Sequence, residues 1–522
     1  MEMLCNALLS ELVGRSISFL VSTYATRPPA AVLKEEHHLH RLRLLLLRAA
    51  TVVEEADGRH VADRGALRRQ LAALRDEMFS GHYVLDTYVC RQAGRQRRRP
   101  VAGGHNDGAS GRRDEDEVRR RGWSSSSNPA KRARRQLRLS GDDDDDDDPE
   151  TTVAAKSPRE LRRAVRRLKA IAGDTKELVV FLTTCPPLRR RQPYSAHLSM
   201  DRCMFGRHAE KDRVMEFLLQ LEPLGAANYP GVLPIVGPAL IGKSTLVEHV
   251  CNDERVRDHF SMIMFYSGDD LDNETFSLSF RDNCVIKHQA RNASGDERWL
   301  LGIELAGDID DIAWKRLYSW GRSMPRGSKL IVTSRSDKIA RLGTTLPLRL
   351  KPLTREAFWY FFKVLVFGST DPEESPELAA MAMAMALEFG GSFMHACIGA
   401  AMLRCDFRAR FWRTVQGRLR WYTQKNRIVF GEYPDELEAM DRPRYVLSMV
   451  SRVPDDECFV LYEMRQRSAA REDDGDLPEV TMVDLMTGRA RPRTPGRFEV
   501  LYWQSAVPPY FNYVRQCEIG EM

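Results

Sequence analysis

The sequence has no apolar run that is long and continuous enough to span a membrane. Its longest apolar region, residues 378–403, is interrupted by Glu388 and by the Gly390–Gly391 pair, which predicts two packed helices. The N-terminal stretch MEMLCNALLSELVGRSISFLVSTY contains Glu11 and Arg15 and lacks a basic start, so it does not match a secretory signal. We therefore expect a cytoplasmic protein, with the nucleus as an alternative location.

Paired cysteines are also absent. The ten cysteines form no C-x-x-C pair and have no histidine nearby at zinc-ligand spacing. In a chain of 522 residues, such scattered cysteines are expected to be reduced core residues. The stretch EEHHLH, residues 35–40, lies on a predicted helix with leucines on its other face, so we interpret it as a solvated face and assign it no metal.

A strong net charge is missing too, because the formal value is only +6. The charge is nevertheless uneven: arginine-rich runs such as RQRRRP and KRARRQLR occur within residues 91–140, and seven aspartates follow directly at Asp142–Asp148. Such a stretch has little apolar surface to bury, and we interpret residues 94–155 as a disordered charged linker. Nuclear import or nucleic-acid contact is the alternative. Trp123 is the one aromatic residue there, so base stacking is not expected and nucleic acid is not predicted as a partner.

Helical periodicity dominates the segment before this linker. Apolar residues at alternating three- and four-residue steps form one seam over residues 39–56 and a second over 67–78, and a third apolar run follows at 83–89. Short antiparallel helices bury such seams against one another, which predicts a coiled-coil-type bundle over residues 1–93.

Beyond the linker, SPRE at residues 157–160 matches a capping box with Pro158 at the first helical position. It predicts a helix that starts there and packs beside or onto the bundle. This helix belongs to a predicted helical connector over residues 156–200.

Strands alternating with helices begin near residue 201. GVLPIVG, MIMFYS, RWLLGIEL and SKLIVTS are predicted strands, and KSTLVEHVC is the helix that follows the first of them. This alternation indicates an α/β domain of the P-loop NTPase type with a parallel sheet over residues 201–345. GPALIGKST, residues 237–245, stands between the first strand and its helix, and its Gly-x-x-x-x-Gly-Lys-Ser spacing is that of a phosphate-binding loop.

The residue types of this loop suit phosphate chemistry. Gly237 and Gly242 allow tight turns that point backbone N–H groups at phosphate oxygens. Lys243 is expected to reach the β- and γ-phosphates, and the Ser244 hydroxyl to bind Mg²⁺. The positions where such loops often carry glycine are occupied by Pro238, Ala239 and Leu240.

Hydrolysis also needs a metal-binding carboxylate and a group that orients water. The predicted strand LLGIEL offers Glu304 for the metal, but Leu305 stands where a second acid is often found. A leucine cannot orient water, so little hydrolysis is expected and no catalytic residue is assigned. The three acids that follow are interpreted as the polar cap of the next helix, with positioning of water as the alternative: Asp308, Asp310 and Asp311.

In order along the chain, these motifs resemble those of plant intracellular immune receptors of the nucleotide-binding leucine-rich-repeat type, which carry a coiled-coil domain and an NB-ARC domain. LRDEMFSGHYVLDTYV, residues 74–89, looks like the family's acidic motif. FGRHAEKDRVMEFLL, residues 205–219, is similar to the segment that borders the adenine, and GSKLIVTSR, residues 327–335, to the sensor strand. LRLKPLTREAFWYFFKVLVFG looks like the start of a helical subdomain, over residues 346–430.

The resemblance implies ADP or ATP as the ligand, with Mg²⁺ held by Ser244 and Glu304. The nucleotide contacts that it implies come from Phe205, Gly206, Arg207, Gly237, Pro238, Ala239, Leu240, Ile241, Gly242, Lys243, Ser244, Thr245 and Arg335.

The sequence also departs from the family pattern. The Gly-Leu-Pro-Leu motif is matched only by GGSFMHA, residues 390–396, which lacks the proline. No Met-His-Asp motif and no leucine-rich repeat follow residue 430, and residues 431–522 are expected to form a few strands of unknown fold. The chain is therefore expected to be a truncated or divergent member.

Three functions remain open from the sequence. The first is an ADP- or ATP-binding switch or accessory protein in plant defence, with little hydrolysis, which contacts other immune receptors or signalling proteins through its bundle or associates with itself. The second is a scaffold or decoy with a dead pocket that pairs with full-length receptors. The third is an active ATPase.

Overall fold

The structure is a computed structural model in which a defined set of residues can be described. These are residues 30–57, 59, 65–98, 149–173, 175–185, 204–220, 229–267, 285–289, 297–305, 307–368, 370–434, 437, 442–447, 458–467, 477–490, 496–507 and 510–520. The expected linker over residues 94–155 lies only partly outside this set: residues 94–98, with most of the first arginine run, end one helix, and residues 149–155 begin the next. The second arginine run and the aspartate run lie outside the described residues.

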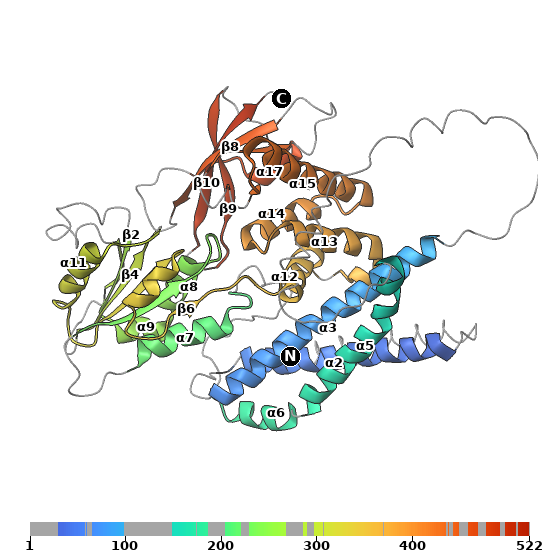
Figure 1. Cartoon of the computed structure of the whole chain (residues 1–522), viewed down its shortest axis with the longest axis horizontal. Helices are drawn as coiled ribbons and strands as arrows, with labels where there is room; N and C mark the ends of the chain where they lie inside the picture. Colours follow the sequence, from blue (N-terminus) through green and yellow to red (C-terminus); the bar gives the residue numbers. More distant parts are fainter. Residues whose placement is uncertain are drawn as a thin grey trace, which may run out of the picture.

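The N-terminal helices form a bundle, drawn in blue and teal in Figure 1. Its members are α2 (Ala30–Asp57), α3 (Gly65–Arg98), α5 (Pro149–Gly173) and α6 (Thr175–Thr183). The seams predicted from periodicity face inward, since Leu42, Leu74 and Leu161 are at most 1% exposed. Helix α5, which belongs to the segment expected as a connector, contacts both α2 and α3 and so completes the bundle.

The predicted start of helix α5, with Pro158 at its first position, was wrong. Helix α5 begins at Pro149, and Pro158 lies inside it. Proline is favoured at a helix start, and the Ala-Ala-Lys run that follows Pro149 has high helix propensity. These residues extend the helix toward its N-terminus at the cost of one backbone hydrogen bond at Pro158.

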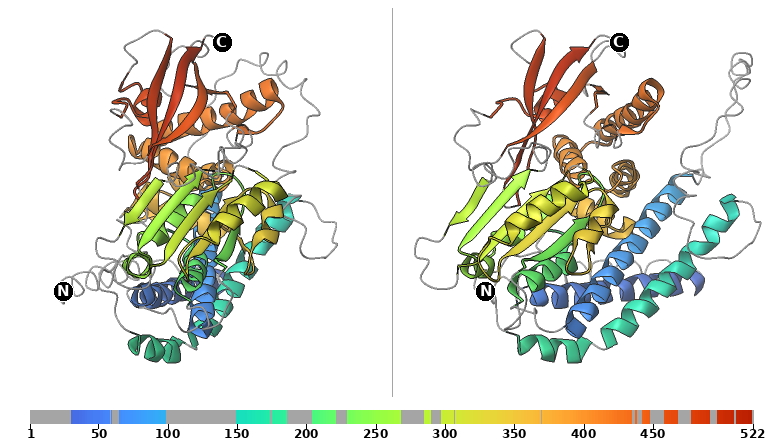
Figure 2. Two further views of the ribbon diagram at one scale, coloured as in Figure 1. Left: turned by 90° about the vertical axis from the view of Figure 1, so that its left-hand side faces the viewer. Right: turned by 60° about the vertical axis from the view of Figure 1, so that its left-hand side comes forward.

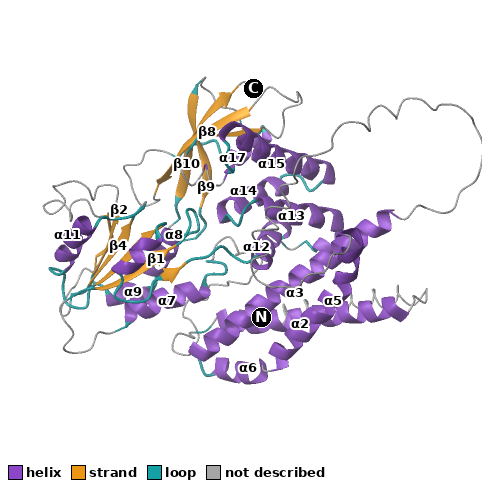
Figure 3. Ribbon diagram, viewed as in Figure 1, coloured by secondary structure: helices purple, strands orange, loops and turns teal. Residues whose placement is uncertain are grey.

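A six-stranded sheet forms the centre of the α/β region, shown with its helices in Figure 3. Its strands are β1 (Gly231–Val236), β2 (Met262–Ser267), β3 (Val285–Gln289), β4 (Trp299–Glu304), β5 (Lys329–Ser334) and β6 (Leu348–Arg349), in the order β3-β2-β4-β5-β1-β6. The four predicted strands are present and parallel. The sheet is nevertheless mixed, because the half-exposed edge strand β3 pairs antiparallel with β2.

Helices cover both faces of this sheet. They are α7 (His208–Leu219), α8 (Lys243–Cys251), α9 (Glu254–His259) and α11 (Asp311–Gly321). Alternating strand residues divide between two buried clusters: Leu233 packs with α7 and α8, and Val232 packs with α11. This alternation follows from the two-residue period of a strand. It places α8 and the loop before it on one face of the sheet.

A helical region follows the sheet. It comprises the 3₁₀ turn η4 (Pro372–Glu374) and the helices α12 (Arg355–Phe367), α13 (Pro376–Glu388), α14 (Phe393–Arg404) and α15 (Ala409–Phe430). Another 3₁₀ turn, η3 (Asp337–Leu342), lies between β5 and β6 and packs in the core of the sheet. The prediction of two helices over 378–403 is confirmed, since α13 ends before Gly390 and Gly391, both of which have positive φ. Both helices pack on α12. Among the helices that can be described, none combines the length and apolarity needed to cross a membrane.

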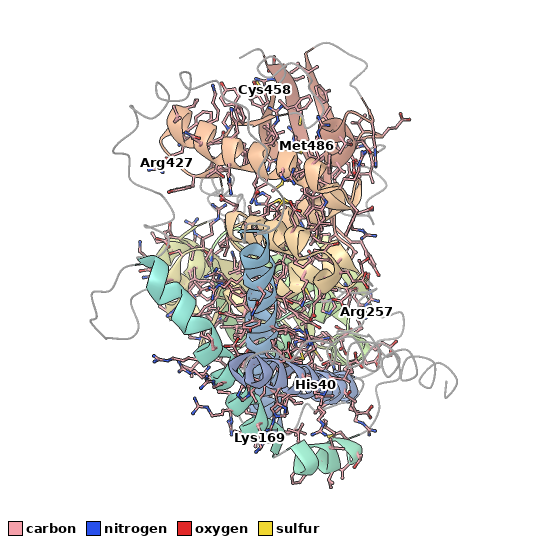
Figure 4. All side chains as sticks on the ribbon, turned by 90° about the vertical axis from the view of Figure 1, so that its right-hand side faces the viewer. His40, Lys169, Arg257, Arg427, Cys458 and Met486 are labelled. Carbon is pink, nitrogen blue, oxygen red and sulfur yellow. The ribbon has the colours of Figure 1, made fainter. Side chains whose placement is uncertain are left out.

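The C-terminal region forms a four-stranded antiparallel sheet. It contains β7 (Arg444–Leu447), β8 (Cys458–Arg467), β9 (Arg497–Gln504) and β10 (Asn512–Gly520), in the order β7-β8-β10-β9, with the short helix α17 (Met482–Thr487). Strand β7 packs on α15 and strand β9 on α17, which in turn contacts α14. In Figure 4 Cys458 and Met486 mark this region, and Arg427 lies on α15. The few strands expected at the C-terminus therefore form one sheet.

The bundle docks on the helical region through a buried polar contact. Asp86 of α3 accepts hydrogen bonds from Trp359 Nε1 at 2.8 Å and from Lys363 Nζ at 2.7 Å, both on α12. Asp86 is only 5% exposed. At the edge of the same interface, Arg43 of α2 forms a bidentate ion pair with Glu373. The bundle is thus anchored to the rest of the chain through charge as well as apolar packing.

Candidate functional site

The loop between β1 and α8 has the backbone geometry of a phosphate-binding turn. Gly242 adopts a φ of +90°, and a side chain on Gly237 would lie 2.8 Å from the Leu350 carbonyl oxygen. Only glycine tolerates both conditions without strain. The Gly237 N–H donates to the Ser334 carbonyl at 3.2 Å, which ties the start of the loop to β5.

The middle of the loop departs from this pattern. Leu240 has a φ of +56° and a side chain that is 39% exposed. A non-glycine residue in the left-handed region costs on the order of 1–2 kcal/mol. The neighbouring Ile241 is buried in the core beside α8 and holds the loop to the domain. The loop therefore keeps a turn that depends on glycine at both ends, but its middle carries a partly exposed leucine.

Lys243 points back into the loop. Its Nζ donates to the carbonyls of Gly237 at 2.9 Å and Pro238 at 2.7 Å. An ammonium group has three N–H donors, so one more is available for an anion. Burial lowers the pKa of Lys243 to about 8, with Glu304 opposing this shift and Arg335 adding to it.

Ser244 and Glu304 lie together on the metal side of the loop. The Ser244 hydroxyl donates to Glu304 Oε1 at 2.5 Å, so α8 and the end of β4 meet here. A hydroxyl and a carboxylate are oxygen ligands of the kind that Mg²⁺ prefers. The structure thus brings together the two residues predicted as metal ligands. Among the residues that can be described, no group of three or more His, Cys, Asp or Glu side chains could hold a metal ion by itself.

The sheet presents two further groups to the loop. Arg335 directly follows β5 and acts electrostatically on Lys243, as its effect on the lysine pKa shows. Thr333, two residues earlier, pairs in register with Glu304. It is 4% exposed, and its Oγ1 has no hydrogen-bond partner. Thr333 lies on the same sheet face as Ile331, which packs with α8. An unpartnered buried hydroxyl beside the loop suits a polar ligand.

The segment expected to border the adenine is held by other parts of the chain. The Phe205 ring is 4% exposed and packs against Phe79 of α3 and Phe361 of α12, each at 5.3 Å between centroids. Gly206 follows in a left-handed turn. Arg207 donates to the Lys351 carbonyl at 2.7 Å and to the Ile241 carbonyl at 3.5 Å. The segment therefore joins the loop to the bundle and the helical region.

The acids after Glu304 have partners of their own. Asp310 accepts from the Ala313 N–H and caps α11, as predicted. Asp308 pairs with Lys338 at 2.6 Å, which lowers its pKa, and Asp311 pairs with Arg341 at 2.7 Å. Leu305 is 6% exposed and packs in the core. Because this residue is a leucine, the position of the expected second acid is apolar.

One contact at the site was not predicted. Tyr513, on β10, lies near Thr245 and Glu248 of α8 and near Glu304, and burial raises its pKa to about 12. Tyr513 and these residues are far apart in the sequence, and the C-terminal segment carried only a general strand pattern. No local signal therefore indicated this proximity.

The loop, the start of α8 and the end of β4 together offer backbone N–H groups, an ammonium, hydroxyls and a carboxylate. These are the groups that phosphate and Mg²⁺ binding require. Among the described residues, no carboxylate stands at the position of Leu305, where it could orient a water molecule.

Comparisons with known proteins identify relatives of one kind. No family model matches the chain. It is 25% identical over 280 residues to "Disease resistance protein RGA2" of Solanum bulbocastanum, covering 51% of this chain and 28% of that protein. "Putative disease resistance protein RGA1" of the same species is 26% identical over 231 residues, covering 42% of this chain and 23% of that protein. "Putative disease resistance RPP13-like protein 1" of Arabidopsis thaliana is 23% identical over 276 residues, covering 50% and 26%. The chain thus spans about a quarter of the length of these relatives.

Proposed function

We propose that this chain, which is homologous over about half of its length to plant disease resistance proteins, is a nucleotide-binding switch or accessory protein in plant immune defence. Its ligand is ADP or ATP, with Mg²⁺ on the side of Ser244 and Glu304, and it hydrolyses little. The observation that carries the proposal is the geometry of the loop: glycines allow its turn, and the Lys243 ammonium uses two of its three N–H donors within the loop, which leaves one for a phosphate.

Its own residues would divide the work as follows. Loop N–H groups and Lys243 would hold the phosphates, and Ser244 with Glu304 would hold the metal, whose charge supports phosphate binding when bound. Arg335 lies at the end of β5, where it can sense the terminal phosphate. The apolar Leu305 cannot orient water, which favours binding over turnover.

We further propose a layout that follows the sequence expectation of an NB-ARC resistance protein. The bundle would contact other immune receptors or signalling proteins, or a second copy of itself, from a cytoplasmic or nuclear location. The sheet and loop would bind the nucleotide, and the helical region would transmit a conformational change between the loop and the bundle. The direct contacts of α3 with α12 and α13 support this route.

A thermal-shift experiment tests the binding claim. ADP with Mg²⁺ at a hundred times its dissociation constant should raise the free energy of unfolding by about 2.7 kcal/mol. Lys243→Ala should show no such shift, because it loses the ammonium that holds the phosphates. A wild-type chain whose melting is unaffected by ADP and ATP would contradict the proposal and favour the scaffold with a dead pocket.

The active ATPase is the second candidate, and Glu304 beside Ser244 is the observation that favours it. Phosphate release from ATP separates it from the switch. The proposal expects release near the background of Lys243→Ala, whereas turnover that depends on both Lys243 and Glu304 would establish the enzyme instead.

A further inference from the structure

A cavity of about 90 Å³ lies between the helical region and the C-terminal sheet. Figure 2 shows these two regions beside each other, the helices in orange and the strands in red. Helix α14 lines the cavity with Ile398 and Met402, and α15 lines it with Val415 and Leu419. Residues four positions apart share one face of a helix, so each helix turns one face to the cavity. Strands β7, β8 and β9 and helix α17 close the other side.

The cavity is apolar at its depth. Val415, Leu461 and Met482, which line it from α15, β8 and α17, are at most 2% exposed. Met402 and Met486 add two more flexible thioether side chains, which adapt to irregular apolar shapes. An engineered apolar cavity of about 150 Å³ binds a benzene ring, so this smaller one suits an alkyl chain better than a whole ring.

The mouth of the cavity is charged. Arg418 lines it one turn after Val415 on α15 and is partly exposed. Among the described residues, no carboxylate pairs with Arg418, whereas Arg413 on the same helix bonds Glu377 at 2.8 Å. Glu388 is the one acid among the described lining residues, and its side chain is exposed. A charge acts more strongly where water screens it less, so the partly buried arginine favours an anion at the mouth.

We propose that this cavity binds a short-chain monocarboxylate. The alkyl chain fills the apolar part, and the carboxylate accepts hydrogen bonds from the Arg418 guanidinium, whose planar fork matches a carboxylate. One arginine beside an exposed acid favours a single negative charge over a phosphate monoester, which carries nearly two. Bound ligand would tie α14 and α15 to the C-terminal sheet. The cavity shares no residue with the phosphate loop, so this inference goes beyond the proposed function and does not depend on it.

Calorimetric titration of the full chain with hexanoate tests the site. Hexanamide, which has the same chain and a neutral head, should bind about tenfold more weakly, because it loses a hydrogen bond to a charged group. Arg418→Gln should abolish this preference. Arg420→Gln is the matched control, since Arg420 is exposed on the same helix outside the lining, and it should keep the preference. Equal binding of the two ligands by the wild-type chain, or no binding of either, would overturn the proposal.

A series of carboxylates from acetate to octanoate shows whether the alkyl chain enters the cavity. Each methylene that becomes buried should tighten binding about fourfold, and the gain should stop once the cavity is full. If acetate binds as tightly as hexanoate, Arg418 attracts small anions at the surface only, and the proposal is wrong.

Val446→Phe closes the site from the sheet side. Val446 lines the cavity from β7 and is 7% exposed, so the larger ring should occupy the space of the alkyl chain and prevent hexanoate binding. A variant that is folded by circular dichroism and still binds hexanoate would contradict the assignment. If the variant does not fold, the chain-length series on the wild-type protein decides. Lys243→Ala should bind hexanoate like the wild type, which separates this site from the phosphate loop.

Discussion

Lys243 has a pKa lowered to about 8, chiefly because burial disfavours its charged form. Phosphate binding needs the charged form, so the proton must be present when nucleotide binds. Affinity for ADP should therefore be constant below about pH 8 and fall by up to tenfold per pH unit above it. Titrations of ADP binding at several pH values from about 6.5 to about 10 measure the effect.

Lys243→Arg is the control for this prediction, since arginine stays charged over the whole range. Its affinity should be almost independent of pH, whatever its absolute value. A wild-type affinity that stays flat to pH 10, about two units above the shifted value, would contradict the role given to the lysine ammonium.

At the residue scale, the sequence predicted what depends on neighbours along the chain. The loop from Gly237 to Thr245 is one local turn between a strand and a helix, so its residue types fix its shape. Glu304 and Ser244 also meet as expected, because parallel strands end at the same sheet edge. Phe205 could not be placed in this way, since its ring packs on side chains from α3 and α12 that only the tertiary fold brings near.

At the scale of secondary-structure elements, the contact between α3 and α12 holds the bundle to the helical region. Asp86→Ala should leave Lys363 without its acceptor in a site where that side chain is only 12% exposed. Breaking a buried pair in this way costs on the order of 3 kcal/mol. The bundle should then detach more often, which hydrogen exchange in α3 and α12 measures.

Two controls set the scale of this effect. Asp86→Asn keeps an acceptor for Trp359 Nε1 and should cost less. Arg43→Ala removes the half-exposed pair with Glu373, whose side chains are 36% and 31% exposed, and should cost below about 1 kcal/mol. If Asp86→Ala proves no more disruptive than Arg43→Ala, the buried contact does not anchor the bundle.

The sequence predicted elements wherever the periodicity was strong. The helices of the bundle and the strands β1, β2, β4 and β5 carry continuous apolar patterns. Strand β3 was missed because VIKHQ is short and half exposed at the sheet edge. The start of α5 was misjudged because a capping signal at Ser157 competes with helix-forming residues before it.

At the scale of the whole molecule, the phosphate loop lies where three regions meet. Phe79 of the bundle and Phe361 of the helical region pack on Phe205. Arg207, two residues further on, donates to the Ile241 carbonyl of the loop at 3.5 Å. Val507, which follows β9, is buried in one cluster with Ile241. Motifs placed the loop in the sequence, but no sequence pattern placed the C-terminal sheet against it, because that contact joins distant segments. The loop is thus linked by contacts to the bundle, the helical region and the C-terminal region.

The nucleotide content of the purified chain tests this account most directly. Acid releases bound nucleotide, which is quantified beside a Lys243→Ala preparation whose fold is checked by circular dichroism. The account predicts nearly one ADP or ATP per wild-type chain and almost none in the variant. A wild-type chain that folds normally, carries no nucleotide and takes up none from added ADP with Mg²⁺ would contradict it.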